Sequence, residues 1–312
     1  MQLSGIVVID KPAGRTSHDV VQGVKKILRV RKAGHTGTLD PLATGVLPVC
    51  TNEATKLVPF LAEECKKYRV TMRLGTTTDT LDIEGKVLAQ KDVAVDALEI
   101  ERVLMEFQGE VEQRPPRYSA VKYKGKALYK WARKGQPVDA PPRRVVIYGI
   151  TLESIQLPDV VFQVSCSRGT YVRSLCSDVG DRLGCGACLQ SLRRTKSGPF
   201  VETMAVSLIG KEEAFLRDSL ERKMMTMSEA LPGLGQVVVE DAMADRLRKG
   251  FQPTVESLAG KEIPSLAAGD VIKLITRDFK LVAMARMIRS SEQRASADLK
   301  ERFMEILRVF ND

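Results

Sequence analysis

A loop rich in glycine and threonine, GHTGTLDPLATG at residues 34–45, holds the best candidate for chemistry in this sequence. Asp40 is the single carboxylate of the loop, and His35 stands five residues before it. Glycine permits unusual backbone angles and a close ligand approach, while threonine hydroxyls offer hydrogen bonds. An aspartate before proline also commonly forms a turn or a helix cap. The loop alone therefore leaves both a catalytic and a structural interpretation of Asp40 open.

A strongly basic segment, residues 113–144, is the second candidate for function. It holds ten lysines and arginines and one acid, in a chain whose net charge is +9. Four aromatic residues are interleaved with the basic ones: Tyr118, Tyr123, Tyr129 and Trp131. Such a surface offers both phosphate contacts and stacking faces. Prolines at both ends indicate an excursion from one domain, and we interpret it as a nucleic-acid contact.

Six cysteines include one close pair, Cys185 and Cys188, in a Cys-x-x-Cys arrangement. This pair could be half of a zinc site or a redox pair. A zinc site needs two further ligands, and the only histidines are His18 and His35. Packed, reduced thiols are the favoured interpretation. With no phosphate-binding or dinucleotide-binding glycine motif in context, we expect no metal and no cofactor.

The length of 312 residues suggests two domains, and 44% hydrophobic with 28% charged residues is ordinary for a globular protein. No apolar run approaches the roughly 18–20 residues that span a bilayer, and the first residues lack the basic start of a signal peptide. We therefore expect a cytoplasmic protein with no membrane contact.

Hydrophobic periodicity predicts the elements that must position the loop. Apolar residues at helical spacing predict helices at 16–30, 53–64, 96–110 and 170–184. Short apolar or alternating runs predict strands at 5–10, 46–50 and 67–75, and an antiparallel pair at 145–157 and 160–167. After about residue 230 short apolar strands and glycine turns predict a small β-rich domain. Its last stretch, from Leu299 to Phe310, fits helical spacing but could also end in a strand.

At the Asp40 loop the sequence resembles the TruB family of bacterial tRNA pseudouridine-55 synthases. Four further segments support this resemblance in the right order: KPAGRTSHDVV (11–21), KYRVTMRLGTTTDTLDIEG (67–85), YSAVKYKGKALYKWARKG (118–135) and CSRGTYVRSLCSDVGDRLGCGACLQSLRRTKSGPF (166–200). The DPLATG loop is the most specific of these motifs. Residues 231–312 resemble the small RNA-binding PUA domain of the family more weakly.

The resemblance implies an isomerase that converts uridine 55 in the tRNA T-loop to pseudouridine. This reaction breaks the bond from C1′ to N1 of uracil, turns the base and bonds C1′ to C5, so it needs one ionised carboxylate and no cofactor. Asp40 is the matching residue. Arg173 matches the arginine that pairs with it, and Asp82, ahead of Asp79, is expected to hold that arginine from the other side.

The resemblance also implies a pocket for the flipped base. Tyr68 matches the tyrosine that stacks on the base, and Tyr171 and Leu192 match further pocket residues. His35 is expected to fill the space that the base leaves. The basic residues expected to grip the RNA are Lys122, Lys124, Lys126, Lys130, Arg133 and Lys134.

The implied fold is α+β, with a mixed, mostly antiparallel sheet flanked by helices and a small β-rich PUA-like domain. We expect a catalytic domain at 1–230, with an RNA-gripping insertion at about 113–144, and the PUA-like domain at 231–312. The expected partner is the T-arm of tRNA, bound by a monomer without an obligatory protein partner.

Three other interpretations differ in function. A non-catalytic tRNA-binding or folding factor would explain the basic segment and the C-terminal domain, but not the matching motifs at Asp40, Tyr68 and Arg173. An RNA-guided relative from a ribonucleoprotein would depend on partner proteins, whereas this chain has its own basic insertion. A glycosidase would need a second acid, and nothing marks one in the Asp40 loop.

Overall fold

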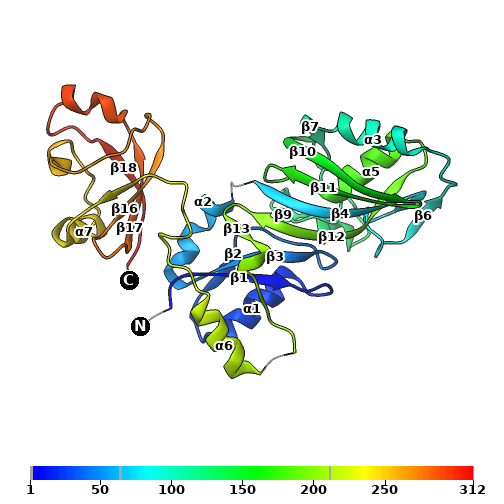
Figure 1. The fold of residues 1–312 in the computed structure, drawn as a ribbon, viewed down its shortest axis with the longest axis horizontal. Coiled ribbons are helices and arrows are strands. Elements are labelled where there is room, and N and C mark those ends of the chain that lie inside the picture. Colours follow the sequence, from blue (N-terminus) through cyan, green and yellow to red (C-terminus); the bar gives the residue numbers. More distant parts are fainter. Residues whose placement is uncertain (1–2, 63–64, 211, 312) are drawn as a thin grey trace.

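The computed structural model describes residues 3–62, 65–210 and 212–311, which form a large sheet with helices and a smaller C-terminal sheet (Figure 1). The large sheet runs in the order β14-β1-β3-β12-β4-β11-β10-β7, with β2 added to β3 and β13 to β12. Only the β1–β14 and β3–β12 pairs in it are parallel. The expected mixed, mostly antiparallel sheet is confirmed.

The strands of this sheet are β1 (Ile6–Lys11), β2 (Ala33–His35), β3 (Thr44–Thr51), β4 (Lys66–Leu74), β7 (Gly109–Gln113), β10 (Arg143–Gln156), β11 (Asp159–Cys166), β12 (Ala187–Ser197), β13 (Phe200–Val201) and β14 (Val206–Ser207). Two small hairpins stand apart from it: β5 (Thr76–Thr78) with β6 (Val87–Gln90), and β8 (Lys122–Tyr123) with β9 (Lys126–Ala127).

Helices cover the two halves of the large sheet separately. The helices α1 (Ser17–Ile27) and α6 (Glu213–Arg222) contact each other, and α1 packs on β1, β2 and β3. The helices α3 (Ala97–Glu106) and α5 (Val172–Arg182) contact each other and cover the half with β4, β10 and β12 (Figure 1). The short helix α4 (Leu128–Ala132) follows the β8–β9 hairpin.

The predicted helices and strands are largely found. Thr16 caps α1 with a capping box, and Asp96 caps α3, because each side chain accepts a hydrogen bond from a first-turn amide. The helix expected at 53–64 is a 3₁₀ turn (Asn52–Leu57) followed by α2 (Val58–Ala62), and residues 63–64 lie outside the described residues. The pair β10–β11 is antiparallel, as predicted.

The two halves of the large sheet meet at a short seam. There β3 and β12 run parallel and pair only at Thr44 with Arg193 and at Gly45 with Arg194. Gly45 has a φ of +96°, and a Cβ placed on it would lie 2.3 Å from the Arg194 carbonyl oxygen. Only glycine therefore allows β12 to approach β3 this closely.

The C-terminal sheet has the order β15 (Gln236–Val238), β16 (Val271–Ile275), β17 (Leu281–Met287) and β18 (Met304–Val309). The last stretch ends as the strand β18, so the open choice between helix and strand is resolved. A helix, α7 (Asp241–Arg248), contacts β17 and was not predicted. Buried residues of the two sheets share one core, which includes Ile6, Val46, Met284 and Phe310.

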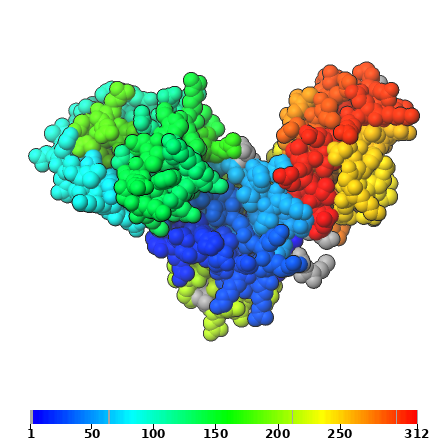
Figure 2. Space-filling model, turned by 180° about the vertical axis from the view of Figure 1, so that it is seen from behind, coloured from blue at the N-terminus to red at the C-terminus, as the bar shows by residue number. Residues whose placement is uncertain are grey.

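The molecular surface is hollowed between the C-terminal sheet and the green and cyan part of the large sheet (Figure 2). Residues in blue, from the first quarter of the chain, form the floor of this hollow. Within the described ranges, no helix is both long and apolar enough to cross a membrane.

Candidate active site

A cavity of about 330 Å³ opens at the seam and gathers five of the seven predicted catalytic and substrate-binding residues. Its lining includes Asp40, Tyr68, Tyr171, Arg173 and Leu192. They come from both halves of the sheet, because Asp40 follows β2, Tyr68 and Leu192 lie on β4 and β12, and the other two begin α5. This volume is at the lower end of ordinary small-molecule sites and suits one nucleoside.

The Asp40 loop is fixed by the first residue of α1 and by residues just before this helix. The Ser17 hydroxyl accepts a hydrogen bond from the Leu39 amide and donates to the Leu39 carbonyl, at 2.8 and 3.0 Å. The amide of Gly14 and the ammonium of Lys11 both donate to the Pro41 carbonyl, at 2.9 and 3.1 Å. The carbonyls of the residues before and after Asp40 are thus held in place by hydrogen bonds from the KPAGRTS segment. This segment therefore positions the loop.

Asp40 forms an ion pair with Arg173. Its Oδ2 lies 2.9 Å from Arg173 Nε, and the Asp40 side chain keeps 36% of its surface exposed, whereas Arg173 keeps 5%. Burial raises the pKa of the Asp40 carboxyl above its ordinary value, and the charge of Arg173 opposes that rise. A partly dehydrated carboxylate beside a fixed cation can attack an electron-poor carbon or stabilise positive charge.

Arg173 is held from three further directions. Its Nη1 donates to the Thr80 carbonyl at 3.0 Å and lies 3.5 Å from Asp82 Oδ2, and its Nη2 donates to the Tyr118 carbonyl at 2.9 Å. Asp82 is buried and accepts hydrogen bonds from the Thr80 hydroxyl and the Glu84 amide. Asp82 therefore contacts the arginine from outside the cavity lining, whereas Asp79 accepts a hydrogen bond from the Lys86 amide.

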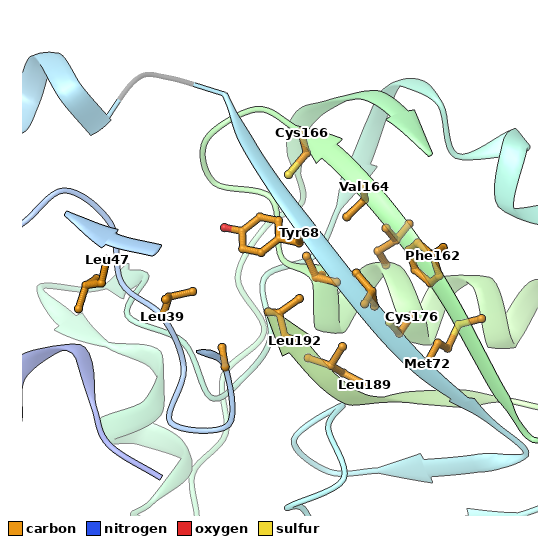
Figure 3. Close-up of a cluster of buried hydrophobic side chains, with 14 of the residues drawn as sticks. Leu39, Leu47, Tyr68, Met72, Phe162, Val164, Cys166, Cys176, Leu189 and Leu192 are labelled. Carbon is orange, nitrogen blue, oxygen red and sulfur yellow. The ribbon is translucent and has the colours of Figure 1, made fainter. Parts of the chain in front are cut away.

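Tyr68 extends from β4 with its hydroxyl pointing toward the half of the sheet that carries Leu39 (Figure 3). Phe162 and Met72 lie farther along the cluster, where Cys176 of α5 is also found (Figure 3). The ring is 8% exposed, and burial raises the pKa of its hydroxyl. An aromatic face at the cavity wall, with Leu192 as an apolar neighbour, offers a stacking surface for a base.

His35 lies on β2, paired with Val49, and does not line the cavity. Its Nδ1 is buried and has no hydrogen-bond partner among the described residues. Burial lowers the pKa of His35, which favours the neutral ring at neutral pH. The side chain is thus a neutral group beside the loop, and its expected role as a wedge stays a prediction.

Two buried cations at the site were not predicted. Lys11 is fully buried, and burial lowers its pKa to about 8, although the nearby Asp40 opposes this. Arg194 is 1% exposed and lines the cavity. The KP dipeptide and the SLRRT segment stand in the quoted motifs, but nothing in them indicates which side chain turns inward.

The basic insertion packs around a small core of Val121, Leu128 and Ala140. Three of the six expected RNA-gripping cations lie over aromatic rings: Lys126 over Trp131, Arg133 over Tyr129 and Lys124 over Tyr123. Five of the six side chains are exposed, and Lys126 is half-buried. The single acid, Asp139, pairs with Arg117 at 2.8 Å, which leaves the exposed face basic.

The base of the insertion is bonded to α5. The buried Gln113 accepts a hydrogen bond from the Tyr171 amide at 2.7 Å and donates to the Tyr171 carbonyl at 2.9 Å. The Ser174 hydroxyl donates to the Arg114 carbonyl at 2.8 Å. The insertion and the residues that begin α5 are therefore one connected unit, and Gln113 is a further residue that the sequence did not reveal.

The cysteine pair is not part of any metal-binding cluster that the described residues form. Cys185 and Cys188 are buried and free. Among the described ranges no group of three or more histidine, cysteine or acidic residues could hold a metal ion.

Two protein-family models match consecutive parts of this chain. Residues 25–172 match the model of the TruB family pseudouridylate synthase N-terminal domain, and residues 173–232 match that of the tRNA pseudouridylate synthase B C-terminal domain. A protein of Syntrophus aciditrophicus named tRNA pseudouridine synthase B is 50% identical over 99% of both chains. Its namesake in Geobacter sulfurreducens is 44% identical over 99% of this chain and 100% of its own.

Solved structures give the same result for the fold. The chain of a Cbf5-Nop10-Gar1 complex matches with a TM-score of 0.75 and 32% identity, over 98% of this chain and 85% of that one. A chain of an H/ACA ribonucleoprotein bound to a substrate RNA matches with a TM-score of 0.76 and 29% identity, over 99% and 85%. The chain described here therefore belongs to the TruB family of tRNA pseudouridine synthases and is an isomerase.

Proposed function

We propose that this enzyme converts uridine 55 in the T-loop of tRNA to pseudouridine, with Asp40 as its catalytic carboxylate. The observation that carries the proposal is the Asp40–Arg173 pair at 2.9 Å, set in a nucleoside-sized cavity beside Tyr68. The position within the tRNA is the one that the family resemblance implies. The reaction breaks the C1′–N1 bond, rotates the base and forms the C1′–C5 bond. The hydrogen on C5 leaves as a proton, and N1 takes up a proton, so the product is an isomer of the substrate.

We propose the following role for each residue around a flipped uridine. Tyr68 stacks on the base, Leu192 forms the apolar wall beside it, and Tyr171 closes the rim at the start of α5. Arg173 keeps Asp40 ionised despite the burial that raises its pKa. His35 fills the space in the tRNA that the base vacates, since it stands at the edge of the loop rather than in the cavity.

The six cations of the insertion contact the RNA backbone: Lys122, Lys124, Lys126, Lys130, Arg133 and Lys134. Their support is the exposed basic face that remains once Asp139 is paired with Arg117. We assign catalysis to residues 1–230 and RNA binding by a PUA-like domain to residues 231–312. The hollow between the two sheets in Figure 2 is a place where an RNA arm fits.

The enzyme is proposed to act as a cytoplasmic monomer, because one chain carries the site and the basic insertion together. Sedimentation of the free protein and of its tRNA complex tests this; a mass of two chains per tRNA would contradict it. The non-catalytic tRNA-folding factor is the second candidate, because the basic insertion alone would serve it as well.

The test is tritium release from a tRNA transcript labelled at C5 of its uridines. Wild-type protein is expected to release about one equivalent, whereas Asp40→Asn releases none yet binds tRNA within several-fold of wild type. Asp96→Asn, at the cap of α3, is the matched control and keeps full activity, since asparagine caps helices equally well. A transcript with cytidine at position 55 is expected to release nothing. Full release from that transcript would refute the position, and no release from any bound tRNA would favour the folding factor.

The insertion is tested by the salt dependence of tRNA binding. Changing Lys122, Lys130 and Lys134 together to alanine should weaken binding and reduce the slope of log K against log salt by roughly 0.7–0.9 for each phosphate that the variant no longer neutralises. Lys86→Ala, an exposed lysine on the turn before β6, is the control. An unchanged slope in the triple variant would remove the insertion from the interface.

A further inference from the structure

Arg194 is a buried guanidinium to which the described part of the chain offers no acidic partner. It is 1% exposed and is the largest of the fully buried side chains. No acid among the described residues forms an ion pair with it, in contrast to Arg193 beside it, which pairs with Asp10 and Glu202. Burying an uncompensated charge is costly, so the position of Arg194 requires an explanation beyond packing.

The guanidinium of Arg194 holds two points on the half of the sheet that carries Asp40. Its Nε donates to the Val46 carbonyl at 2.7 Å, and its Nη2 donates to the Gly37 carbonyl at 3.1 Å. Gly37 is on the catalytic loop three residues before Asp40, and Val46 is on β3 just beyond it. Arg194 therefore ties both ends of this loop to β12.

The same side chain reaches Tyr68 on the other half of the sheet. Arg194 and Tyr68 are directly opposite each other on the antiparallel strands β12 and β4, so their side chains share one face. Both line the cavity. The positive charge of the guanidinium also lowers the pKa of the Tyr68 hydroxyl, against the larger and opposite effect of burial.

We propose that Arg194 is a positioning residue for the reaction, which fixes the Tyr68 ring relative to the Asp40 loop across the seam. The proposal rests on the roles proposed for Asp40 and Tyr68. The carboxylate must meet C1′ while the ring holds the base, and these two groups belong to different halves of the sheet, which pair at only two positions. Arg194 bonds to the loop and faces the tyrosine, so it sets the distance between them.

The test is a double-mutant cycle with Arg194→Lys and Tyr68→Phe, measured as the single-turnover rate of tritium release. A misplacement of about 1 Å can cost roughly 100-fold in rate, so each single variant is expected to be about 10- to 100-fold slow, with tRNA affinity within threefold of wild type. The double variant should be no slower than the slower single variant. Rate losses that multiply, or a normal rate for Arg194→Lys, would overturn the proposal.

Arg193→Lys is the matched control, because it lies next to Arg194 on β12 but does not line the cavity. It is expected to keep its rate within about twofold, because lysine retains the charge that pairs with Asp10 and Glu202 outside the cavity. Tyr68→Leu removes the stacking ring and so tests the proposed role of Tyr68 by itself. A normal rate for Tyr68→Leu would refute stacking, whereas a slow Tyr68→Leu with a multiplying cycle would refute only the role of Arg194.

If Arg194→Lys does not fold, the proposal can be tested by NMR on proteins that keep Arg194. Nitrogen NMR of ¹⁵N-arginine-labelled wild type should show a guanidinium protected from exchange with solvent, and Tyr68→Phe should shift that resonance. Identical protected guanidinium resonances in the two proteins would show that the hydroxyl and Arg194 do not interact.

Discussion

Replacing Arg173 by methionine should lower both the stability and the activity of this enzyme, and a second substitution should restore only the stability. In Arg173→Met, the buried Asp82 loses its cation but keeps its hydrogen bonds from the Thr80 hydroxyl and the Glu84 amide. Breaking a buried ion pair costs about 3–5 kcal/mol. The 3.5 Å separation and the two remaining bonds favour the lower end, about 3 kcal/mol.

The same substitution affects Asp40 differently. Its side chain is 36% exposed, so solvent screens the missing partner and adds little to the stability loss. At about 2–4 °C per kcal/mol for a domain of this size, the Tm should fall by roughly 6–12 °C. Tritium release should fall by about 10²–10³-fold or more, because Asp40 loses the cation that opposes its protonation.

The second variant, Arg173→Met with Asp82→Asn, distinguishes the two effects. Asparagine removes the unpaired buried charge, so the double variant should regain about 1–3 kcal/mol of stability. Its rate of tritium release should stay as low as that of Arg173→Met, since Asp40 still lacks a cation. Arg182→Met, on the same helix but 65% exposed, should change stability by no more than about 0.5 kcal/mol. A Tm for Arg173→Met within about 2 °C of wild type, or no recovery in the double variant, would refute the reasoning.

Three further predictions concern the backbone and the charge at the site. Gly45→Ala should prevent folding, because the added Cβ would meet the Arg194 carbonyl. Gly14 also has a positive φ but has open space around it, so Gly14→Ala should lower the free energy of unfolding by only about 1 kcal/mol. Equal urea midpoints for the two variants would contradict this prediction. Gln113→Glu cannot donate to the Tyr171 carbonyl and should lower kcat more than tRNA affinity, while an equal loss of both would point to a general packing defect. Burial raises the pKa of Asp40 above 3.8, so the folded state binds this proton more tightly than the unfolded state does. Protonation therefore stabilises the fold at acid pH, and this stabilisation is lost as the pH rises through the raised pKa. Asp40→Asn should therefore gain stability relative to wild type from acid to neutral pH in urea melts, and a difference independent of pH would contradict it.

The sequence could predict residues whose type is chemically marked. Asp40, Tyr68 and Arg173 stand in distinctive motifs, and the structure brings all three to one cavity. Their local elements were also predictable, since apolar spacing and caps define α1, β4 and α5 with boundaries wrong by no more than a few residues.

The residues that the sequence did not reveal act through backbone carbonyls. Lys11 donates to Pro41, and Arg194 donates to Gly37 and Val46. Every residue has a backbone carbonyl, so the sequence does not indicate which carbonyl a given side chain will bind. Gln113 is the same case, because its partner is the backbone of Tyr171. Such contacts become visible only when the strands are placed beside each other.

The C-terminal stretch shows a different limit. Phe303 and Phe310 are buried, as the helical pattern also required, but Leu299 is 61% exposed and β18 begins only at Met304. Spacing alone does not distinguish a helix from an edge strand here, because pairing with β17 decides the outcome.

The seam between β3 and β12 also has a consequence for how the chain acquires its activity. Asp40 depends on one half of the large sheet, while Tyr68, Leu192 and Arg173 depend on the other, and the two halves pair through residues distant in sequence. Contacts of high sequence separation form late and slowly in folding. A folding intermediate with only one half ordered would therefore have no substrate pocket and no paired carboxylate. In a refolding experiment, catalytic activity would therefore return last, after the secondary structure. Its return would report the pairing of β3 with β12.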